Sequence, residues 1–422
     1  MDSLNPSAIA DALLGFVFYY PLFMAYLWMA GALYYWLHYE RSSGRPDDPP
    51  ELDEYPPVAV IVPCHNEEAH VVETIEWLMA SKYPDLEVVA VDDGSTDGTA
   101  AALGRLAERF PALRVVHLAH NQGKAAALNA AAAMTRAEFL VCIDGDALLD
   151  PSAVHWLMWH FRSPRVGAVT GNPRVRTRST LLGRLQVGEF SSIVGLIKRA
   201  QRTYGRVFTV SGVVSAFRRR ALHDVGYWST DMLTEDVDVS WKLQTRRWDV
   251  RFEPNALCWI LMPETFRGLW RQRLRWATGG MQVLIRNWHG LHAWNMRRMW
   301  PVFTEFVVSA VWAYAMMGVI LLWLLGTVLG LPVPIEIPTL LPNWSGVVVG
   351  TTCLLQVATG MLLDSRVEKG LFKHYFWMIW YPLAFWLINV FTTVVGVPRA
   401  LLRSRGERAR WKSPDRGLLP DR

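Results

Sequence analysis

Hydrophobic residues follow two different patterns along the chain. From residue 58 to about residue 262, short β-branched runs alternate with helical segments of about 10 to 15 residues, which is typical of βαβ units on a parallel sheet. Before and after this region lie uncharged runs long enough to cross a bilayer, whose hydrocarbon core needs about 20 helical residues. The pattern predicts an α/β domain embedded between membrane helices.

The α/β region begins with regular units. The pattern predicts strands over residues 58–62, 88–91, 115–118 and 139–143, and a helix after each of the first three. The second half is less regular. There we expect a strand over 166–170, a long helix over 181–199, strands within 207–217 broken at Ser211 and Gly212, a helix opened by residues 234–236, and closing strands over 250–252 and 256–260.

Four uncharged runs are candidates for membrane-spanning helices: residues 12–37, 306–331, 344–363 and 375–397. The first run could also be a cleavable signal peptide. However, Asp2 and Asp11 stand where a basic segment should precede it, and the run is too long. Arg41 and Arg45 follow it, so the positive-inside rule puts the N-terminus outside and the α/β domain in the cytoplasm.

The membrane topology contains one conflict. With the α/β domain inside, three further crossings would place the tail over residues 399–422 outside, although its many arginines favour the inside. Either one run is re-entrant or the tail is an exception. Pro382 lies within the last run, which makes that run the weakest candidate.

Two connecting segments differ from both patterns. Residues 44–57 carry five prolines among acidic residues, as in an irregular linker. Residues 266–300 mix tryptophans, leucines and arginines, as in amphipathic helices at the cytoplasmic membrane interface. We therefore divide the chain into a membrane helix (1–40), a linker (41–57), the α/β domain (58–264), interface helices (265–300), membrane helices (301–398) and a basic tail (399–422).

Composition supports membrane attachment and argues against two other classes. The 422 residues are 51% hydrophobic and include 21 tryptophans, which is high for a soluble protein. A formal net charge of only +5, without a long basic tract in the middle of the chain, gives little support to nucleic-acid binding. The four cysteines include no C-x-x-C pair, so neither a zinc site nor a disulfide framework is indicated.

Polar clusters follow the first four predicted strands, at the edge where α/β sheets bind ligands. In chain order they are His65, Asn66 and Glu67; Asp92 and Asp93; Asn121 to Lys124; and Asp144 and Asp146. Two carboxylates one residue apart suit a divalent cation that bridges to phosphate oxygens. A lysine at a helix start suits a phosphate, because the helix end is also positive.

Four motifs stand in a fixed order between residues 92 and 276. They are Asp-Asp at 92–93, Asp-x-Asp at 144–146, Thr-Glu-Asp at 234–236 and Gln-x-x-Arg-Trp at 272–276. In this order they resemble the signature of the processive family 2 glycosyltransferases, which include hyaluronan, chitin and cellulose synthases. The runs over 171–199 and 256–276 are most similar to the branch that makes bacterial poly-β-1,6-N-acetylglucosamine.

The resemblance implies a Rossmann-like GT-A fold that binds UDP-N-acetylglucosamine together with Mg²⁺ or Mn²⁺. Asp146 is the expected metal ligand, with Asp144 beside it touching metal or ribose. Asp92 and Asp93 would hold the uracil and ribose. The other expected contacts to the nucleotide sugar, including its diphosphate, are His65, Asn66, Glu67, Lys124, Gln272, Arg273 and Arg275.

The acceptor side of the expected site centres on Asp236. With Glu235 beside it, Asp236 is our candidate for the general base that takes the proton of the attacking hydroxyl. Direct displacement would invert the donor and give a β-linkage. Residues expected beside the acceptor sugar are Trp276, Ser211, Gly212 and Glu189, although Val213 and Val214 after Ser-Gly leave the role of that loop open.

Several of these residues have a purely structural alternative. The acidic residues over 92–97 could form only a turn and a helix cap, which is the favoured reading for Asp97. Thr234 could cap a helix whose first turn is enriched in carboxylates. Lys124 could simply be solvated. For Trp270, Trp288 and Trp294, membrane anchoring is favoured.

As a whole, the resemblance implies a multi-pass synthase of the bacterial inner membrane that makes biofilm polysaccharide and passes it between its own helices. It also implies a small membrane partner subunit and activation by cyclic di-GMP at the interface with that subunit. The alternatives are a chitin- or hyaluronan-type product, a lipid-linked transferase, and a non-catalytic transporter or scaffold. The last predicts losses among the acidic motif residues, and none is missing.

Overall fold

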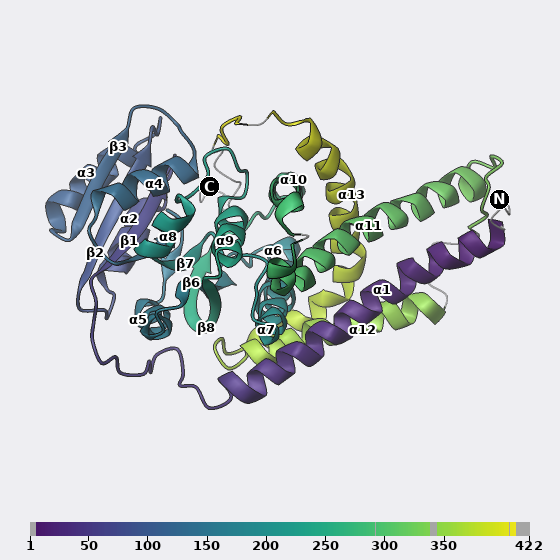
Figure 1. The fold of residues 1–422 in the computed structure, drawn as a ribbon, viewed down its shortest axis with the longest axis horizontal. Helices are drawn as coiled ribbons and strands as arrows, with labels where there is room; N and C mark the ends of the chain where they lie inside the picture. The colour runs from purple at the N-terminus through teal and green to yellow at the C-terminus, as the bar shows by residue number, and fades with distance from the viewer. Residues whose placement is uncertain (1–5, 292, 338–343, 405, 411–422) are drawn as a thin grey trace.

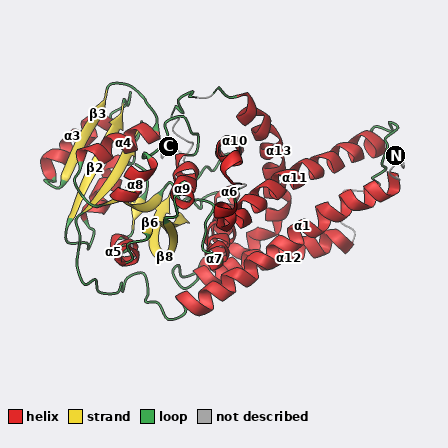
Figure 2. Cartoon of the chain, viewed as in Figure 1, coloured by secondary structure: helices red, strands yellow, loops and turns green. Residues whose placement is uncertain are grey.

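The computed structural model describes residues 6–291, 293–337, 344–404 and 406–410. Its α/β domain lies at one end of the molecule, and long helices extend from it toward the other end, where the N-terminus lies (Figures 1 and 2). Within the described ranges, eight strands form one sheet in the order β3-β2-β1-β4-β7-β6-β8-β5.

The first half of the sheet is parallel, as the βαβ pattern predicts. It consists of β1 (Val58–Cys64), β2 (Leu86–Asp93), β3 (Leu113–Leu118) and β4 (Phe139–Ile143), connected by α2 (Val71–Met79), α3 (Thr99–Arg109) and α4 (Lys124–Met134). Along β1, Val60 and Val62 pack into the core on one face, whereas Ala59 and Ile61 pack into the core on the other. Burial on both faces explains why these strands are continuous hydrophobic runs.

The less regular second half of the sheet is mixed, so the parallel arrangement typical of βαβ units ends at β4. β7 (Val214–Arg218) runs antiparallel to β4 and to β6 (Val166–Val175). β8 (Asp249–Ile260) is parallel to β6 and antiparallel to the short β5 (Leu148–Leu149), which the sequence did not reveal. The two predicted closing strands are one strand, with a register shift opposite β6 between Thr170 and Asn172.

The predicted strands before Val214 are absent from the described structure of this segment. The backbone N–H groups of Val207, Val210 and Ser211 donate instead to the side chains of Gln244, Ser240 and Thr170. Because side chains take the place of a neighbouring strand, residues 207–213 form an ordered loop. This loop carries Ser211 and Gly212 into the site described below.

The predicted helix over 181–199 exists and continues to Thr203. It consists of α6 (Leu181–Glu189), a π-helical turn (Phe190–Gly195) and α7 (Leu196–Thr203). The remaining α-helices are α1 (Pro6–Tyr35), α5 (Ala153–Trp159), α8 (Arg219–Val225), α9 (Glu235–Thr245), α10 (Phe266–Leu291), α11 (Trp300–Trp323), α12 (Trp344–Asp364) and α13 (Tyr381–Leu402). Residues 371–380 form a 3₁₀-helix, so the last apolar helix begins later than predicted.

In the part of the chain that the structure describes, four helical segments are long and apolar enough to cross a membrane: Ala8–Glu40, Trp294–Val328, Ser345–Asp364 and Ala384–Leu402. In Figure 1, α1, α11 and α12 extend together away from the α/β domain, and α1 packs against both partners. By contrast, α13 packs along α10 and α11 and runs in another direction.

The described part of the tail returns to the α/β domain. The backbone N–H of Ala409 donates to the carbonyl oxygen of Thr230 at 2.9 Å. The described part of the tail therefore packs against the α/β domain. The part of the predicted basic tail after Arg410 lies outside the described residues.

A buried ion-pair network joins the membrane helices to the α/β domain. Asp364, at the end of α12, accepts hydrogen bonds from Arg174 of β6 at 2.5 Å and Arg199 of α7 at 2.8 Å. Arg199 also donates to Glu40, which follows α1, at 2.7 Å. Glu368 completes the network with Arg174 at 2.7 Å. All of these side chains are buried, so their relative positions are tightly constrained.

Candidate active site

Lys124 lies at the centre of the predicted acidic motifs. Its ammonium group contacts the Asp144 carboxylate, the carbonyl oxygen of Gly212 at 3.0 Å and the Glu235 carboxylate at 3.5 Å. Burial disfavours its charge, but Asp144 and Glu235 raise the pKa of Lys124 above its ordinary value. The solvated alternative for this lysine is therefore wrong, and its charge holds segments from four parts of the chain together.

The Asp-x-Asp motif follows β4 directly. A Cβ on Gly145 would lie 3.1 Å from Cγ of Glu67 and 3.2 Å from Sγ of Cys64, so a side chain in this turn would require these neighbours to shift. Asp146 is buried, and burial together with the charge of Asp144 raises the pKa of Asp146 to about 7. Two crowded carboxylates are stabilised by a divalent cation between or beside them.

This acidic pair fits Mg²⁺ or Mn²⁺, both of which prefer oxygen ligands. Among the residues that the structure describes, no group of three or more His, Cys, Asp or Glu side chains could hold a metal ion by itself. Substrate phosphate oxygens and water would then complete the coordination, as is usual for metals that act on phosphates.

Asp236 lies in the first turn of α9, where two backbone groups orient its carboxylate. Oδ2 accepts from the N–H of Gly212 at 3.2 Å and Oδ1 from the N–H of Val237 at 2.9 Å. A Cβ on Gly212 would lie 3.1 Å from Oδ2, so a side chain there would crowd the carboxylate. Burial and the neighbouring Glu235 raise the pKa of Asp236 to about 6.

Thr234 occupies the position of a helix cap, as the structural alternative predicts, but it does not act as one. Thr234 is the N-cap residue of α9, but its hydroxyl makes no capping hydrogen bond. Instead, Gly279 of α10 packs so closely that a Cβ there would lie 2.5 Å from the Thr234 side chain. The Thr-Glu-Asp turn is therefore held by packing against α10, the helix that carries the Gln-x-x-Arg-Trp motif.

The two carboxylates after β2 have different surroundings. The oxygens of Asp93 accept from the backbone N–H groups of Gln122 and Gly123, both at 2.8 Å, and Asp93 is fully buried. Asp92 accepts from the N–H of Ser95 at 3.0 Å and contacts the His117 ring at 3.2 Å. Asp93 thus shapes the loop that leads to Lys124. The nucleotide contacts expected of this pair stay a prediction.

The loop after β1 is cross-linked to the loop after β2. His65 contacts the carbonyl oxygen of Asp93 at 3.0 Å, and the Asn66 side chain accepts from the N–H of Thr96 at 2.8 Å. Asn66 has a φ of 56°, which asparagine tolerates better than most residues. The backbone N–H of Glu67 donates to the Thr99 hydroxyl at 2.7 Å. These contacts place the predicted nucleotide residues at one edge of the sheet.

Asp97 has the structural role that was favoured for it. Its carboxylate accepts from the backbone N–H of Thr99 at 3.0 Å and from that of Glu68 at 3.2 Å. It therefore ties the start of α3 to the loop after β1.

The Gln-x-x-Arg-Trp motif divides between two neighbourhoods. Arg275 donates to the carbonyl oxygen of Leu233 at 3.1 Å, and its charge opposes the effect of burial on the pKa of Asp236. Arg273 instead forms a buried ion pair with Glu189 at 2.6 Å and stacks 4.2 Å above the Trp276 ring. The structure thus places Arg273 with two of the four predicted acceptor residues, Glu189 and Trp276. The amide oxygen of Gln272 is buried without a partner in the described part of the chain.

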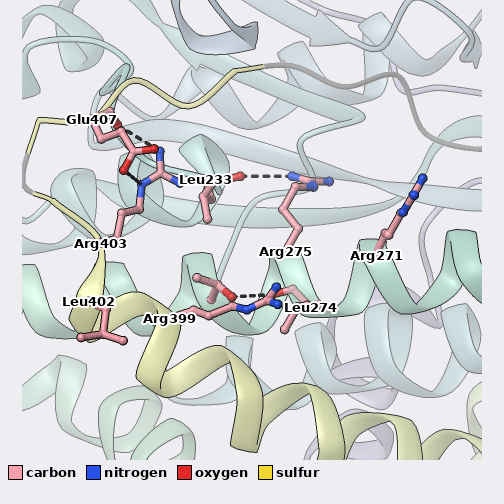
Figure 3. A pocket seen from close by; sticks show the side chains of 9 residues that line it. Leu233, Arg271, Leu274, Arg275, Arg399, Leu402, Arg403 and Glu407 are labelled. Atoms are coloured by element: carbon pink, nitrogen blue, oxygen red, sulfur yellow. Dashed lines mark hydrogen bonds and ion pairs between the residues drawn. The ribbon is translucent and has the colours of Figure 1, made fainter.

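A cavity of about 520 Å³ opens beside Arg275 (Figure 3). It is lined by Leu233, Arg271, Leu274, Arg275, Thr278, Arg399, Leu402, Arg403 and Glu407. Four arginines against one carboxylate make it suitable for an anionic group. One wall belongs to residues 403–410, which we call the C-terminal arm.

The C-terminal arm reaches the start of α4. The carbonyl oxygen of Ala409 would lie 2.1 Å from a Cβ on Gly123, the residue that precedes Lys124 and has a φ of 94°. The sequence marked this segment as basic, but only the folded chain shows that it covers part of the site. Sequence reasoning also missed Lys198, a buried lysine inside an otherwise ordinary amphipathic helix.

Replacing Ala409 by Pro should release the arm, because proline lacks the N–H that donates to Thr230. We expect trypsin to cleave after Arg403 and Arg410 several times faster than in the parent, whereas Ala409→Gly, which keeps the N–H, should change these rates less. Cleavage after Arg408 is not compared, because trypsin does not cut before proline. Limited proteolysis followed by mass spectrometry measures both. Equal cleavage rates in the parent and Ala409→Pro would mean that this hydrogen bond does not hold the arm.

Comparison with known proteins agrees with the arrangement of these motifs. Residues 56–279 match the family model described as "Glycosyltransferase like family 2". The poly-beta-1,6-N-acetyl-D-glucosamine synthase of Staphylococcus aureus (strain COL) is 36% identical over 408 residues, which cover 95% of this chain and 98% of the relative. The protein of the same name from Staphylococcus epidermidis is 34% identical over 406 residues, covering 96% and 98%.

A solved structure shares the fold. The mannosyltransferase PcManGT from Pyrobaculum calidifontis, in complex with GDP-Man and Mn²⁺, superimposes with a TM-score of 0.65 at 20% identity. The match covers 94% of this chain and 98% of that chain. The fold is therefore of the GT-A type, as expected from the sequence.

Proposed function

The chain belongs to glycosyltransferase family 2, and we propose that it polymerises N-acetylglucosamine from UDP-N-acetylglucosamine into poly-β-1,6-N-acetylglucosamine. The main support for this proposal is the 36% identity to a synthase of that name over 95% of the chain. The contact of Lys124 with both Asp144 and Glu235 supports it, because it joins the donor and acceptor motifs.

Donor binding is proposed at the carboxyl ends of β1, β2 and β4. The loops after β1 and β2 would hold the uracil and ribose, with Asp92 and backbone groups near Asn66 as contacts. Asp144 and Asp146 would hold Mg²⁺ or Mn²⁺, which supplies positive charge for the diphosphate. Lys124 and Arg275 would stabilise the charge that develops on the departing UDP. A guanidinium can do so with two parallel hydrogen bonds.

Transfer itself requires a base on the acceptor side. Asp236 would accept the proton of the attacking hydroxyl while that oxygen displaces UDP from the anomeric carbon, which inverts the configuration there. The N–H groups of Gly212 and Val237 orient the carboxylate for this step. On the acceptor side, Trp276 would offer its exposed face to the sugar, with Arg273 and Glu189 fixing the ring from behind.

The rate of transfer should fall as the pH is lowered through about 6. Asp236 must be ionised to accept a proton, and its pKa is raised to about 6 by burial and by Glu235, so the protonated, inactive form dominates below that pH. The kcat measured against pH, at saturating metal and donor, checks this. An acidic limb near the ordinary value for aspartate, about 4, would contradict the assignment.

The membrane orientation, the cellular location and the partners of the protein are also proposals. We place the α/β domain and the tail in the cytoplasm, because Arg41 and Arg45 follow α1 and the arm contacts Thr230. The contact of the tail with Thr230 favours the re-entrant alternative, so we propose α1, α11 and α12 as the crossings. The bacterial inner-membrane location rests on the family resemblance. A biofilm product, a small partner subunit and cyclic di-GMP as activator rest on the family resemblance alone.

The function is tested with the full chain in membrane vesicles that receive Mg²⁺ and one labelled UDP-sugar at a time. We expect polymer from UDP-N-acetylglucosamine alone, none without metal, and β-1,6 linkages on analysis. A β-1,4 linkage would replace our product by a chitin-type product. No transfer from any donor, even with a partner subunit and cyclic di-GMP, would favour the non-catalytic alternative.

A further inference from the structure

Lys198 of α7 is a buried cation without a carboxylate partner. Only 6% of its surface is exposed. Its ammonium donates to the Thr170 hydroxyl at 3.0 Å and to the Ser211 hydroxyl at 2.6 Å, and it lies 5.9 Å from the centre of the Phe252 ring. Among the residues described, the hydrogen-bond partners of this nitrogen are these two hydroxyls, and it takes part in no ion pair.

Other buried cations nearby do have carboxylate partners. Arg199, the next residue, pairs with both Glu40 and Asp364, and Arg174 pairs with Asp364 and Glu368. A buried ammonium that has only hydroxyl partners is costly, since burial penalises its charged form. Packing alone would be served better by a methionine of similar length, so the lysine needs another explanation.

The hydroxyl partners of Lys198 lead directly to the proposed base. Ser211 is held from two sides, by Lys198 and by the Thr170 hydroxyl, which accepts the Ser211 N–H at 2.8 Å. The next residue, Gly212, donates its N–H to Asp236 at 3.2 Å and accepts from Lys124 at 3.0 Å. Lys198 is therefore connected to the Asp236 carboxylate through the dipeptide Ser211–Gly212.

The electrostatics agree with this geometry. Burial lowers the pKa of Lys198 to about 7, and the charge of Asp236 acts in the opposite direction. Such an attraction is mutual, so a charged Lys198 favours the ionised form of Asp236. The groups facing Lys198 from β6, the 207–213 loop and β8 are hydroxyls and a ring. Asp236 is faced by Glu235 on its own helix, by Lys124 from α4 and by Arg275 from α10.

We propose that Lys198 is a positioning residue for sugar transfer: through Ser211 it fixes the loop that orients the Asp236 carboxylate, and it adds a buried positive charge behind that loop. The inference rests on the proposed function, in which Asp236 is the base. It makes two separate predictions, one for the geometry of the loop and one for the charge.

Lys198→Met removes both contributions. We expect kcat to fall between about tenfold and a hundredfold, with the KM for UDP-N-acetylglucosamine changed less than about twofold, because the donor subsite is untouched. The acidic limb of kcat should also move to higher pH, since Asp236 loses a favourable charge. Ser211→Ala keeps the charge, so it should lower kcat without moving the limb.

Lys242→Met is the matched control. Lys242 donates to the carbonyl oxygen of Tyr227 and the hydroxyl of Ser229, and unlike Lys198 it also pairs with Asp238 at 3.4 Å. Its loss removes lysine contacts on α9 without touching the 207–213 loop. This variant should leave kcat and the limb near parent values. If Lys198→Met does not fold, Ser211→Ala and Lys198→Arg decide. Lys198→Arg keeps the charge and should leave the limb in place.

The inference is overturned if Lys198→Met behaves like Lys242→Met, or if Ser211→Ala transfers sugar at the parent rate. It is also overturned if Lys198→Arg shifts the limb upward. A parent protein that makes no polymer would instead remove the proposed function, so the two failures are distinguishable.

Discussion

Replacing Asp236 by Asn should abolish sugar transfer while the protein still folds and binds its donor. The amide is isosteric with the carboxylate but cannot take the proton of the acceptor hydroxyl. General-base catalysis contributes roughly 10²- to 10⁴-fold, so kcat should fall by about this factor. The KM for the nucleotide sugar should change little, because the donor subsite at Lys124 and Asp144 is intact.

The measurement is the initial rate of UDP release and polymer formation by the purified full chain, with donor binding followed by calorimetry. Asp224→Asn is a matched control, since Asp224 accepts a hydrogen bond from Trp248 at the surface, away from the acidic cluster. It should keep the parent rate. An Asp236→Asn variant that polymerises as fast as the parent would exclude Asp236 as the base and would make Glu235 the next candidate.

The second large effect concerns stability. Asp364→Asn should destabilise the protein by about 3 to 5 kcal/mol, since it removes the carboxylate that the buried guanidinium groups of Arg174 and Arg199 share. The three elements that meet there, α12, β6 and α7, connect the membrane helices to the α/β domain. We therefore expect a lower unfolding temperature and, near it, loss of transfer activity as well.

Thermal unfolding of the purified protein in detergent measures this effect. Glu76→Gln is the control, because the Glu76–Arg109 pair is exposed and such pairs contribute about 0 to 1 kcal/mol. Equal unfolding temperatures for Asp364→Asn and Glu76→Gln would mean that the buried network does not stabilise the junction. Arg366, which also lies near Glu40, would then deserve the same test.

The sequence alone determined the first four strands and the candidate membrane helices. A strand that is buried on both faces, and a helix that contacts lipid, both require a continuous run of apolar residues, which can be recognised in the sequence. Two of the four ordered motifs, those at residues 92–93 and 144–146, could be placed in space for a related reason. Residues directly after parallel strands must meet at one edge of the sheet, whatever the connections between them.

Contacts between distant segments were decided only by the tertiary structure. Local pattern could not show that residues 207–213 bond to side chains instead of a strand, or that Arg273 pairs with Glu189, 84 residues earlier in the chain. It also could not show that the tail packs against the α/β domain, because the charges of the tail do not reveal the contact of Ala409 with Thr230. Lys198 belongs to the same class, because its significance lies in the missing carboxylate around it, and that surrounding exists only in the folded chain.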